Sequence, residues 1–128
     1  MQVDKAISKY NKNYRFKDKL NLNNYPQKKV YDFFIVIPAY CEELYIPFTL
    51  ESLNKQNLEL LNTTLVVIVN NNSKKEQQEI KNNNKRTFIS VTKKQFNFEL
   101  IIIDCYSSKY AFSDKLAGVG LARKIGMD

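Results

Sequence analysis

Residues 33–43 constrain the fold more than any other part of this sequence, because five apolar residues run directly into a proline. The apolar run at 33–37 is too short for a helix and is typical of a strand buried on both faces, as in parallel sheets. Pro38 has no N–H to donate to a neighbouring strand, so we expect the strand to end there. Ligands bind beside the carboxyl ends of strands in open α/β sheets. The sequence therefore predicts a binding site at 38–43.

Two further apolar runs have the same character. The uninterrupted, β-branched run at 64–69 predicts a second buried strand, and it ends in the turn-forming residues 70–73. The run at 98–103 predicts a third buried strand that ends at Asp104. Because parallel strands end at the same edge of a sheet, we expect the polar ends of all three strands to converge there.

The segments between these runs predict helices. Pro47 is tolerated only in the first turn of a helix, so a helix should begin near Ile46. The apolar positions that follow it at helical spacing are Leu50, Leu53 and Leu58. We also expect a polar helix at 74–83, a short edge strand at 87–91 and a small-residue helix at 118–126. Alternating strands and helices predict an α/β fold, Rossmann-like, with three α/β/α layers and a mainly parallel sheet.

The net charge of +7 is unevenly distributed along the 128 residues. Residues 1–30 carry eight Lys or Arg against two Asp, so nearly all of the basic excess lies near the N-terminus. This favours a solvated basic leader at 1–31 and a single domain at 32–128 over a nucleic-acid-binding surface. Tyr10 and Tyr14 interleave with the lysines, which leaves a binder of nucleic acid or of an anionic surface as an alternative.

Residue types that are rare or missing restrict the catalytic and metal-binding groups that this chain can have. The sequence contains no histidine, which excludes a histidine metal site and a histidine base. Cys41 and Cys105 lack the spacing of a metal or redox pair, so we expect free thiols in a reducing compartment. No apolar stretch reaches the roughly 18 residues that cross a bilayer, and no signal core precedes the domain, so a cytoplasmic protein is expected.

Taken singly, the polar residues at the strand ends have ordinary explanations. Glu42 complements the dipole of the following helix, and Tyr40 can either stack on a base or pack on the sheet. Small residues at 118–126 allow a helix N-terminus to approach an anion closely, and Arg123 adds forked donors suited to a diphosphate. That segment does not directly follow a strand, so the dinucleotide-binding fingerprint is not satisfied.

Together, three motifs resemble family 2 glycosyltransferases of the GT-A fold. Residues 35–43 resemble the family's opening strand followed by Pro-Ala-Tyr-Asn-Glu-Glu, with Cys41 in place of the Asn. Residues 67–73 resemble its strand ending in Asp-Asn-Gly-Ser. Residues 118–126 are similar to its Gly-x-x-x-Ala-Arg-Asn-x-Gly. The motifs occur in the family's order, and the stretch from the first to the last spans residues 33–126, about three-quarters of the chain.

The resemblance implies a nucleotide-binding role for residues in all three motifs. The first motif would lie along the uridine and ribose, Asn70 would replace the Asp that binds the base, and the third motif would lie near the diphosphate. An amide can still pair with uracil, although the charge is lost. With the carboxylate that ends the third strand, the predicted nucleotide-binding residues are Pro38, Ala39, Tyr40, Glu42, Asn70, Asp104, Gly120 and Arg123.

One family motif, Asp-x-Asp, is not reached before the chain ends at Asp128. In the family this motif holds the divalent metal on the diphosphate, so Mg²⁺ or Mn²⁺ is expected for a complete enzyme and no metal site in this fragment. We therefore expect the nucleotide-binding half of a transferase that uses a nucleoside-diphosphate sugar, most simply a UDP-sugar. Its acceptor and catalytic residues stay unassigned. The alternatives are a non-catalytic nucleotide-binding domain and the basic-arm binder above.

Overall fold

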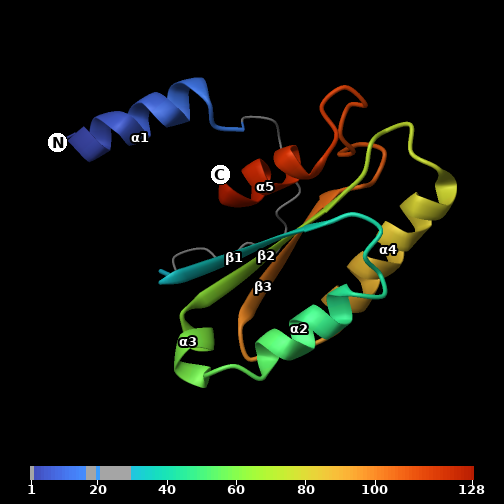
Figure 1. Cartoon of the computed structure of the whole chain (residues 1–128), viewed down its shortest axis with the longest axis horizontal. Helices are drawn as coiled ribbons and strands as arrows, with labels where there is room; N and C mark the ends of the chain where they lie inside the picture. The colour runs from blue at the N-terminus through green and yellow to red at the C-terminus, as the bar shows by residue number, and fades with distance from the viewer. Residues whose placement is uncertain (1, 17–19, 21–29) are drawn as a thin grey trace.

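The structure of this chain is a computed structural model that describes residues 2–16, 20 and 30–128. The sequence also predicts a turn at 23–26, from Asn23-Asn24-Tyr25-Pro26, but these positions lie outside the described residues. After an N-terminal helix, strands and helices alternate along the chain to the last helix, so the fold is mixed α/β (Figure 1).

Three parallel strands form one sheet. They are β1 (Phe33–Ala39), β2 (Thr64–Asn71) and β3 (Glu99–Cys105), in the spatial order β1-β2-β3. Each strand is rich in β-branched or aromatic side chains, and β2 is buried along its whole length because it has a neighbour on both sides. The predicted parallel sheet and its three strands are confirmed.

Helices cover both faces of this sheet (Figure 1). Their bounds are α1 (Gln2–Asn13), α2 (Ile46–Asn54), α3 (Leu58–Asn62), α4 (Gln78–Thr92) and α5 (Val119–Met127). Leu65, Val67 and Val69 of β2 pack with α5 on one face. The alternate residues Val66 and Ile68 pack with α2, α3 and α4 on the other face. This alternation is the period of two expected for a strand, and it places a core on each side of the sheet.

The edge strand predicted at 87–91 is wrong, because these residues belong to α4. The buried residues of this helix are Asn84, Thr87 and Val91, which recur at intervals of three and four. That spacing puts them on one helical face, against the sheet. Burial of this face outweighs the local strand preference of the β-branched residues in the run.

The predicted end of β1 is also wrong, since the strand continues through Pro38 to Ala39. Pro38 lies opposite Val69 in the ladder. Within the described sheet β1 is an edge strand, where a proline without an N–H is tolerated. Its edge position also explains why β1 is not buried on both faces. Phe33 and Phe34 are both about half exposed, at 49% and 58%.

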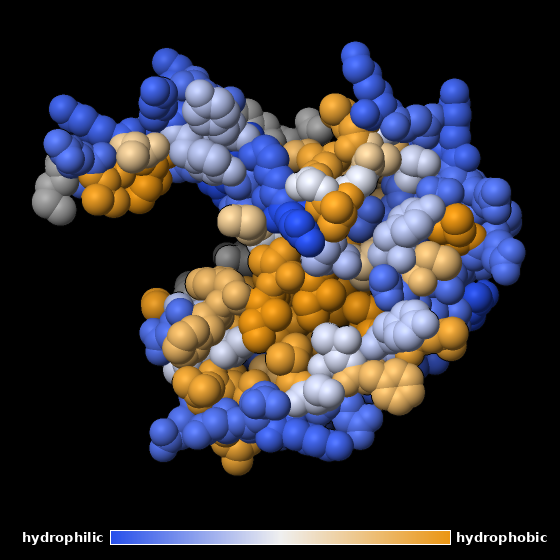
Figure 2. All heavy atoms as spheres, in the orientation of Figure 1, coloured by the Kyte–Doolittle hydropathy of each residue, from blue (hydrophilic) through white to orange (hydrophobic). Residues whose placement is uncertain are grey.

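The N-terminal leader contains a helix that the sequence reading did not predict. Val3, Ile7 and Tyr10 form an apolar stripe along α1, and Tyr14 follows directly after the helix, yet none of the helix's residues is buried. Figures 1 and 2 show α1 projecting from the rest of the molecule, with apolar side chains along one side of it. A groove of about 710 Å³ lies between the end of the leader, the sheet and α5, and Phe16 is among its lining residues.

Asp128 fastens the leader to α5. Its carboxylate accepts hydrogen bonds from the Tyr10 hydroxyl, from the Phe16 N–H at 2.7 Å and from the Lys124 ammonium at 2.8 Å. Burial raises the pKa of Asp128, but these hydrogen bonds outweigh it and hold that pKa below its ordinary value. None of the helices in the described part of the chain is long and apolar enough to cross a bilayer.

Candidate functional site

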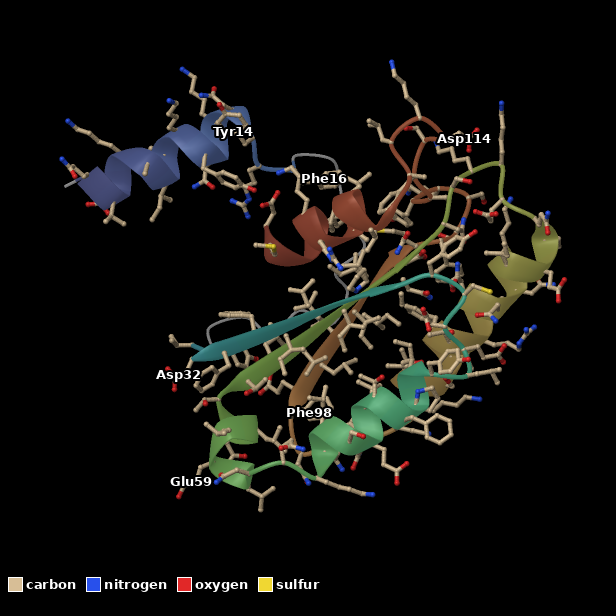
Figure 3. The ribbon with its side chains drawn as sticks, in the orientation of Figure 1. Tyr14, Phe16, Asp32, Glu59, Phe98 and Asp114 are labelled. Atoms are coloured by element: carbon tan, nitrogen blue, oxygen red, sulfur yellow. The ribbon has the colours of Figure 1, made fainter. Side chains whose placement is uncertain are left out.

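A cleft of about 460 Å³ lies at the carboxyl edge of the sheet. Its walls come from three segments: the end of β1 and the loop after it at 38–42, the end of β2 and the loop after it at 71–76, and the loop that leads into α5 at 114–119. Figure 3 shows Asp114 on the loop beyond the carboxyl ends of the strands. The polar side chains that line the cleft are Tyr40, Glu42, Asn71, Asn72, Ser73, Glu76 and Asp114. The site is where strand ends in an α/β sheet were expected to place it.

Of the eight predicted residues, three lie in this cleft. Pro38, Tyr40 and Glu42 all line it, and they come from the end of β1 and the loop that follows. Ala39 lies between them but is fully buried in the core shared with α2 and α4. Its backbone carbonyl accepts a hydrogen bond from the Asn71 amide at 3.0 Å, which ties the ends of β1 and β2 together.

The side chain of Asn70 lies away from the cleft. It is fully buried, and its Nδ2 donates to the backbone carbonyl of Asn84 in α4 at 2.7 Å. Within residues 2–16, 20 and 30–128, its Oδ1 is a buried side-chain atom without a hydrogen-bond partner. The neighbouring residue Asn71 lines the cleft instead. The role of Asn70 in base binding therefore stays a prediction that this geometry does not favour.

The carboxylate of Asp104 closes a turn at the end of β3. It accepts hydrogen bonds from the N–H groups of Tyr106 at 3.0 Å and Ser107 at 2.9 Å, and from the Ser107 hydroxyl at 2.7 Å. Asp104 is almost fully buried and is not among the residues that line the cleft. Asp104 is therefore a turn-forming residue, which is a common role of aspartate.

Only the first two residues of the third motif line the cleft. Gly118 and Val119 line the cleft, whereas Gly120 and Arg123 lie further along α5 and are exposed. Gly118 precedes α5 with a φ of 149°, a conformation that favours glycine, and no side chain caps this end of the helix. The first N–H groups of α5 are therefore presented beside the cleft, as in helix N-termini that bind anions.

The cleft is lined by carboxylates as well as amides. The sequence reading did not identify Glu76 or Asp114, because both lie on loops with no pattern that separates them from ordinary surface acids. The pKa of Tyr40 is raised, first by burial and then by a hydrogen bond with the Glu76 carboxylate. Asp114 accepts a hydrogen bond from the Lys75 N–H at 3.1 Å, which joins the second and third walls.

The described residues include no group of three or more His, Cys, Asp or Glu side chains that could hold a metal ion. The acidic side chains nearest the cleft have other partners: Glu76 with Tyr40, and Asp114 with Lys75. The described part of the chain therefore offers no set of ligands that fits Mg²⁺ or Mn²⁺.

Cys41 and Cys105 lie near the ends of two predicted strands, so the sequence predicts that both thiols are partly accessible, but their environments in the structure differ sharply. Cys41 is exposed beside the cleft, but Cys105 is buried, and burial together with the nearby Asp104 raises the pKa of its thiol to about 12. The thiolate is the reactive form of cysteine.

We expect one equivalent of a thiol reagent to react in the native state at pH 8, at Cys41, with Cys105 reacting only after denaturation. Peptide mapping by mass spectrometry checks this, and native labelling of Cys105 would contradict its burial.

Comparison of the chain with models of protein families, with curated proteins and with solved structures finds no match.

Proposed function

We propose that this chain is the nucleotide-sugar-binding part of a glycosyltransferase whose donor is a UDP-sugar. The observation that carries the proposal is that all three motifs resembling family 2 glycosyltransferases contribute to one cleft. Residues 38–42 belong to the first motif, 71–73 to the second, and 118–119 to the third. They are far apart in the sequence, so it is the fold that brings them together at one cleft.

The chemistry of the cleft walls suits different parts of such a ligand. Tyr40 offers an aromatic face on which a base can stack. The carboxylate of Glu42 is suited to the hydroxyls of ribose. Asn71 also lines the cleft, but its Nδ2 already donates to the backbone carbonyls of Ala39 and Val69. The uncapped N-terminus of α5 at Gly118 is suited to an anionic diphosphate. Arg123, exposed on the same helix, can add charge when the ligand extends along α5.

We expect the chain to bind UDP with a dissociation constant of about 1 mM or tighter, which corresponds to roughly −4 kcal/mol. Titration calorimetry with UDP measures this directly. Mn²⁺ should increase the affinity less than tenfold, because the described residues include no metal-ligand cluster. A dissociation constant for UDP more than 10-fold above this limit would contradict the proposal. Equal affinity for inorganic phosphate would also contradict it.

Tyr40→Ala tests in the same titration whether the base of UDP stacks on Tyr40. Loss of a base-stacking aromatic costs about 1–3 kcal/mol in other proteins, so we expect UDP affinity to fall roughly 5- to 150-fold. The matched control is Tyr45→Ala, which removes an exposed tyrosine from the same loop outside the cleft. Equal effects of the two substitutions would show that UDP does not bind at Tyr40.

A further inference from the structure

A buried asparagine in the middle of α4 connects two walls of the cleft. Asn84 is fully buried, although asparagine is a poor helix former and its amide is costly to bury without partners. It lies on the face of α4 that packs against the sheet, together with Thr87 and Val91. An apolar residue at this position would be the simpler choice for a core-facing helix, so the contacts of the amide require an explanation.

Every polar atom of the Asn84 side chain contacts a cleft wall. Its Nδ2 donates to the backbone carbonyl of Asn71 at 3.0 Å and to Oδ1 of Asn72 at 2.9 Å. Its Oδ1 accepts from the N–H of Cys41 at 3.0 Å. Asn71 and Asn72 belong to the wall at the end of β2. Cys41 belongs to the wall at the end of β1, where it lies between the lining residues Tyr40 and Glu42.

The loop that Asn84 holds has an unfavourable backbone conformation. Cys41 has a φ of 55°, and it is the non-glycine residue with a positive φ in the described part of the chain. Such a conformation is strained for a residue other than glycine and persists where surrounding contacts impose it. The Asn84 bond to the Cys41 N–H supplies one such contact, and Asn83 adds a second by accepting from the Glu43 N–H at 3.2 Å.

We propose that Asn84 is a positioning residue for ligand binding: it holds the walls at the ends of β1 and β2 in one fixed arrangement, so that Tyr40 and Glu42 face the ligand before it binds. The inference rests on the proposed function, since it takes UDP as the ligand of the cleft. Asn84 itself does not line the cleft and acts through the backbone of its neighbours. Such preorganisation raises affinity by avoiding the cost of ordering the loop on binding.

The test compares Asn84→Ala with Val91→Ala. Val91 is buried on the same face of α4, two helical turns further on, and its truncation also destabilises the core without touching either wall. We expect Asn84→Ala to lower UDP affinity at least tenfold, while Val91→Ala stays within twofold of the unsubstituted chain despite a lowered Tm. Asn82→Ala, at an exposed position of α4 outside the cleft, controls for the change in helix propensity and should also bind normally. Equal affinities of Asn84→Ala and Val91→Ala would overturn the inference.

Amide hydrogen exchange at Cys41 gives a second readout that needs no ligand. In the unsubstituted chain the Cys41 N–H should exchange at least tenfold more slowly than that of Leu44 in the same exposed loop. This protection should be lost in Asn84→Ala and kept in Val91→Ala. Rapid exchange of Cys41 in the unsubstituted chain would overturn the inference even where Asn84→Ala fails to fold. If the unsubstituted chain binds no UDP, the proposed function fails, and Cys41 exchange alone decides whether Asn84 holds the walls together.

Discussion

Asn70→Asp should lower the free energy of unfolding by about 3–5 kcal/mol at pH 8, the loss typical of a buried charge without a partner. The resemblance to glycosyltransferases would suggest the opposite, because it places an Asp here as a ligand of the base. In the structure the Asn70 Nδ2 donates to the carbonyl of Asn84, and its Oδ1 already lacks a partner. A carboxylate would place a charged oxygen against that carbonyl oxygen and would find no donor for either of its own oxygens.

The loss should depend on pH in a defined direction. Burial without a donor raises the pKa of an aspartate above its unfolded value of about 3.9, so the folded chain keeps a proton that the unfolded chain has released. Stability therefore falls as pH rises above about 4, and the deficit of Asn70→Asp should be smaller at pH 5 than at pH 8. Urea denaturation at both pH values measures it.

A matched control for this substitution is Asn57→Asp at the N-cap of α3. The Asn57 side chain accepts from the Glu59 N–H at 2.8 Å, a role that Asp performs equally well. It should change stability by less than about 0.5 kcal/mol. If Asn70→Asp is as stable as this control and binds UDP more tightly, residue 70 contacts the base as the resemblance implies.

Gly126→Val should have the second largest effect, a loss of about 3 kcal/mol, at the upper end of the range for overpacking. α5 lies directly on β1 and β2, and Gly126 is at the point of closest approach. A Cβ added there would lie 2.3 Å from Cγ1 of Val36 and 3.2 Å from Cγ2 of Val69. Both neighbours are β-branched and have little rotamer freedom, so α5 must move away from the sheet.

Gly120→Val is the matched control, because Gly120 lies on the same helix but does not face the sheet at close range. A Cβ at Gly120 would meet no atom within 4 Å, so Gly120→Val should stay within about 0.5 kcal/mol of the unsubstituted chain. Thermal and urea denaturation of the two variants give the comparison. Similar stabilities would show that α5 does not pack against β1 through Gly126.

The sheet could be predicted from the sequence because each strand is a short apolar run with a clear end. The errors occurred where tertiary contacts outweigh local preference. Residues 87–91 favour a strand by composition, yet Thr87 and Val91 complete the buried face of α4. Pro38 would end a central strand, but β1 has only one neighbour in the described sheet. The helical spacing of Val3, Ile7 and Tyr10 was visible in the leader and could have predicted α1.

The position of the cleft could be predicted better than the residues that line it. The rule that ligands bind at the carboxyl ends of parallel strands points to this edge of the sheet, and Pro38, Tyr40 and Glu42 line the cleft there. Successive strand residues point to opposite faces, so a shift of one position decides whether Asn70 or Asn71 reaches the cleft. The motif alone does not fix that choice. Glu76 and Asp114 converge on the cleft only through the folded loops that carry them.

The parallel pairing of the strands also determines how this chain can fold. Phe33 pairs with Thr64 and Leu65 pairs with Glu99, so the strand partners are more than 30 positions apart in the sequence. Within the described sheet, no adjacent strands are joined by a tight hairpin that could form early and serve as a template. Each pairing must first close a long loop, and folding slows as such distant contacts come to dominate a structure. Helices α2 and α3 lie between β1 and β2, and α4 lies between β2 and β3. Two walls of the cleft come from the ends of β1 and β2, so the cleft cannot be complete before these two distant segments have paired.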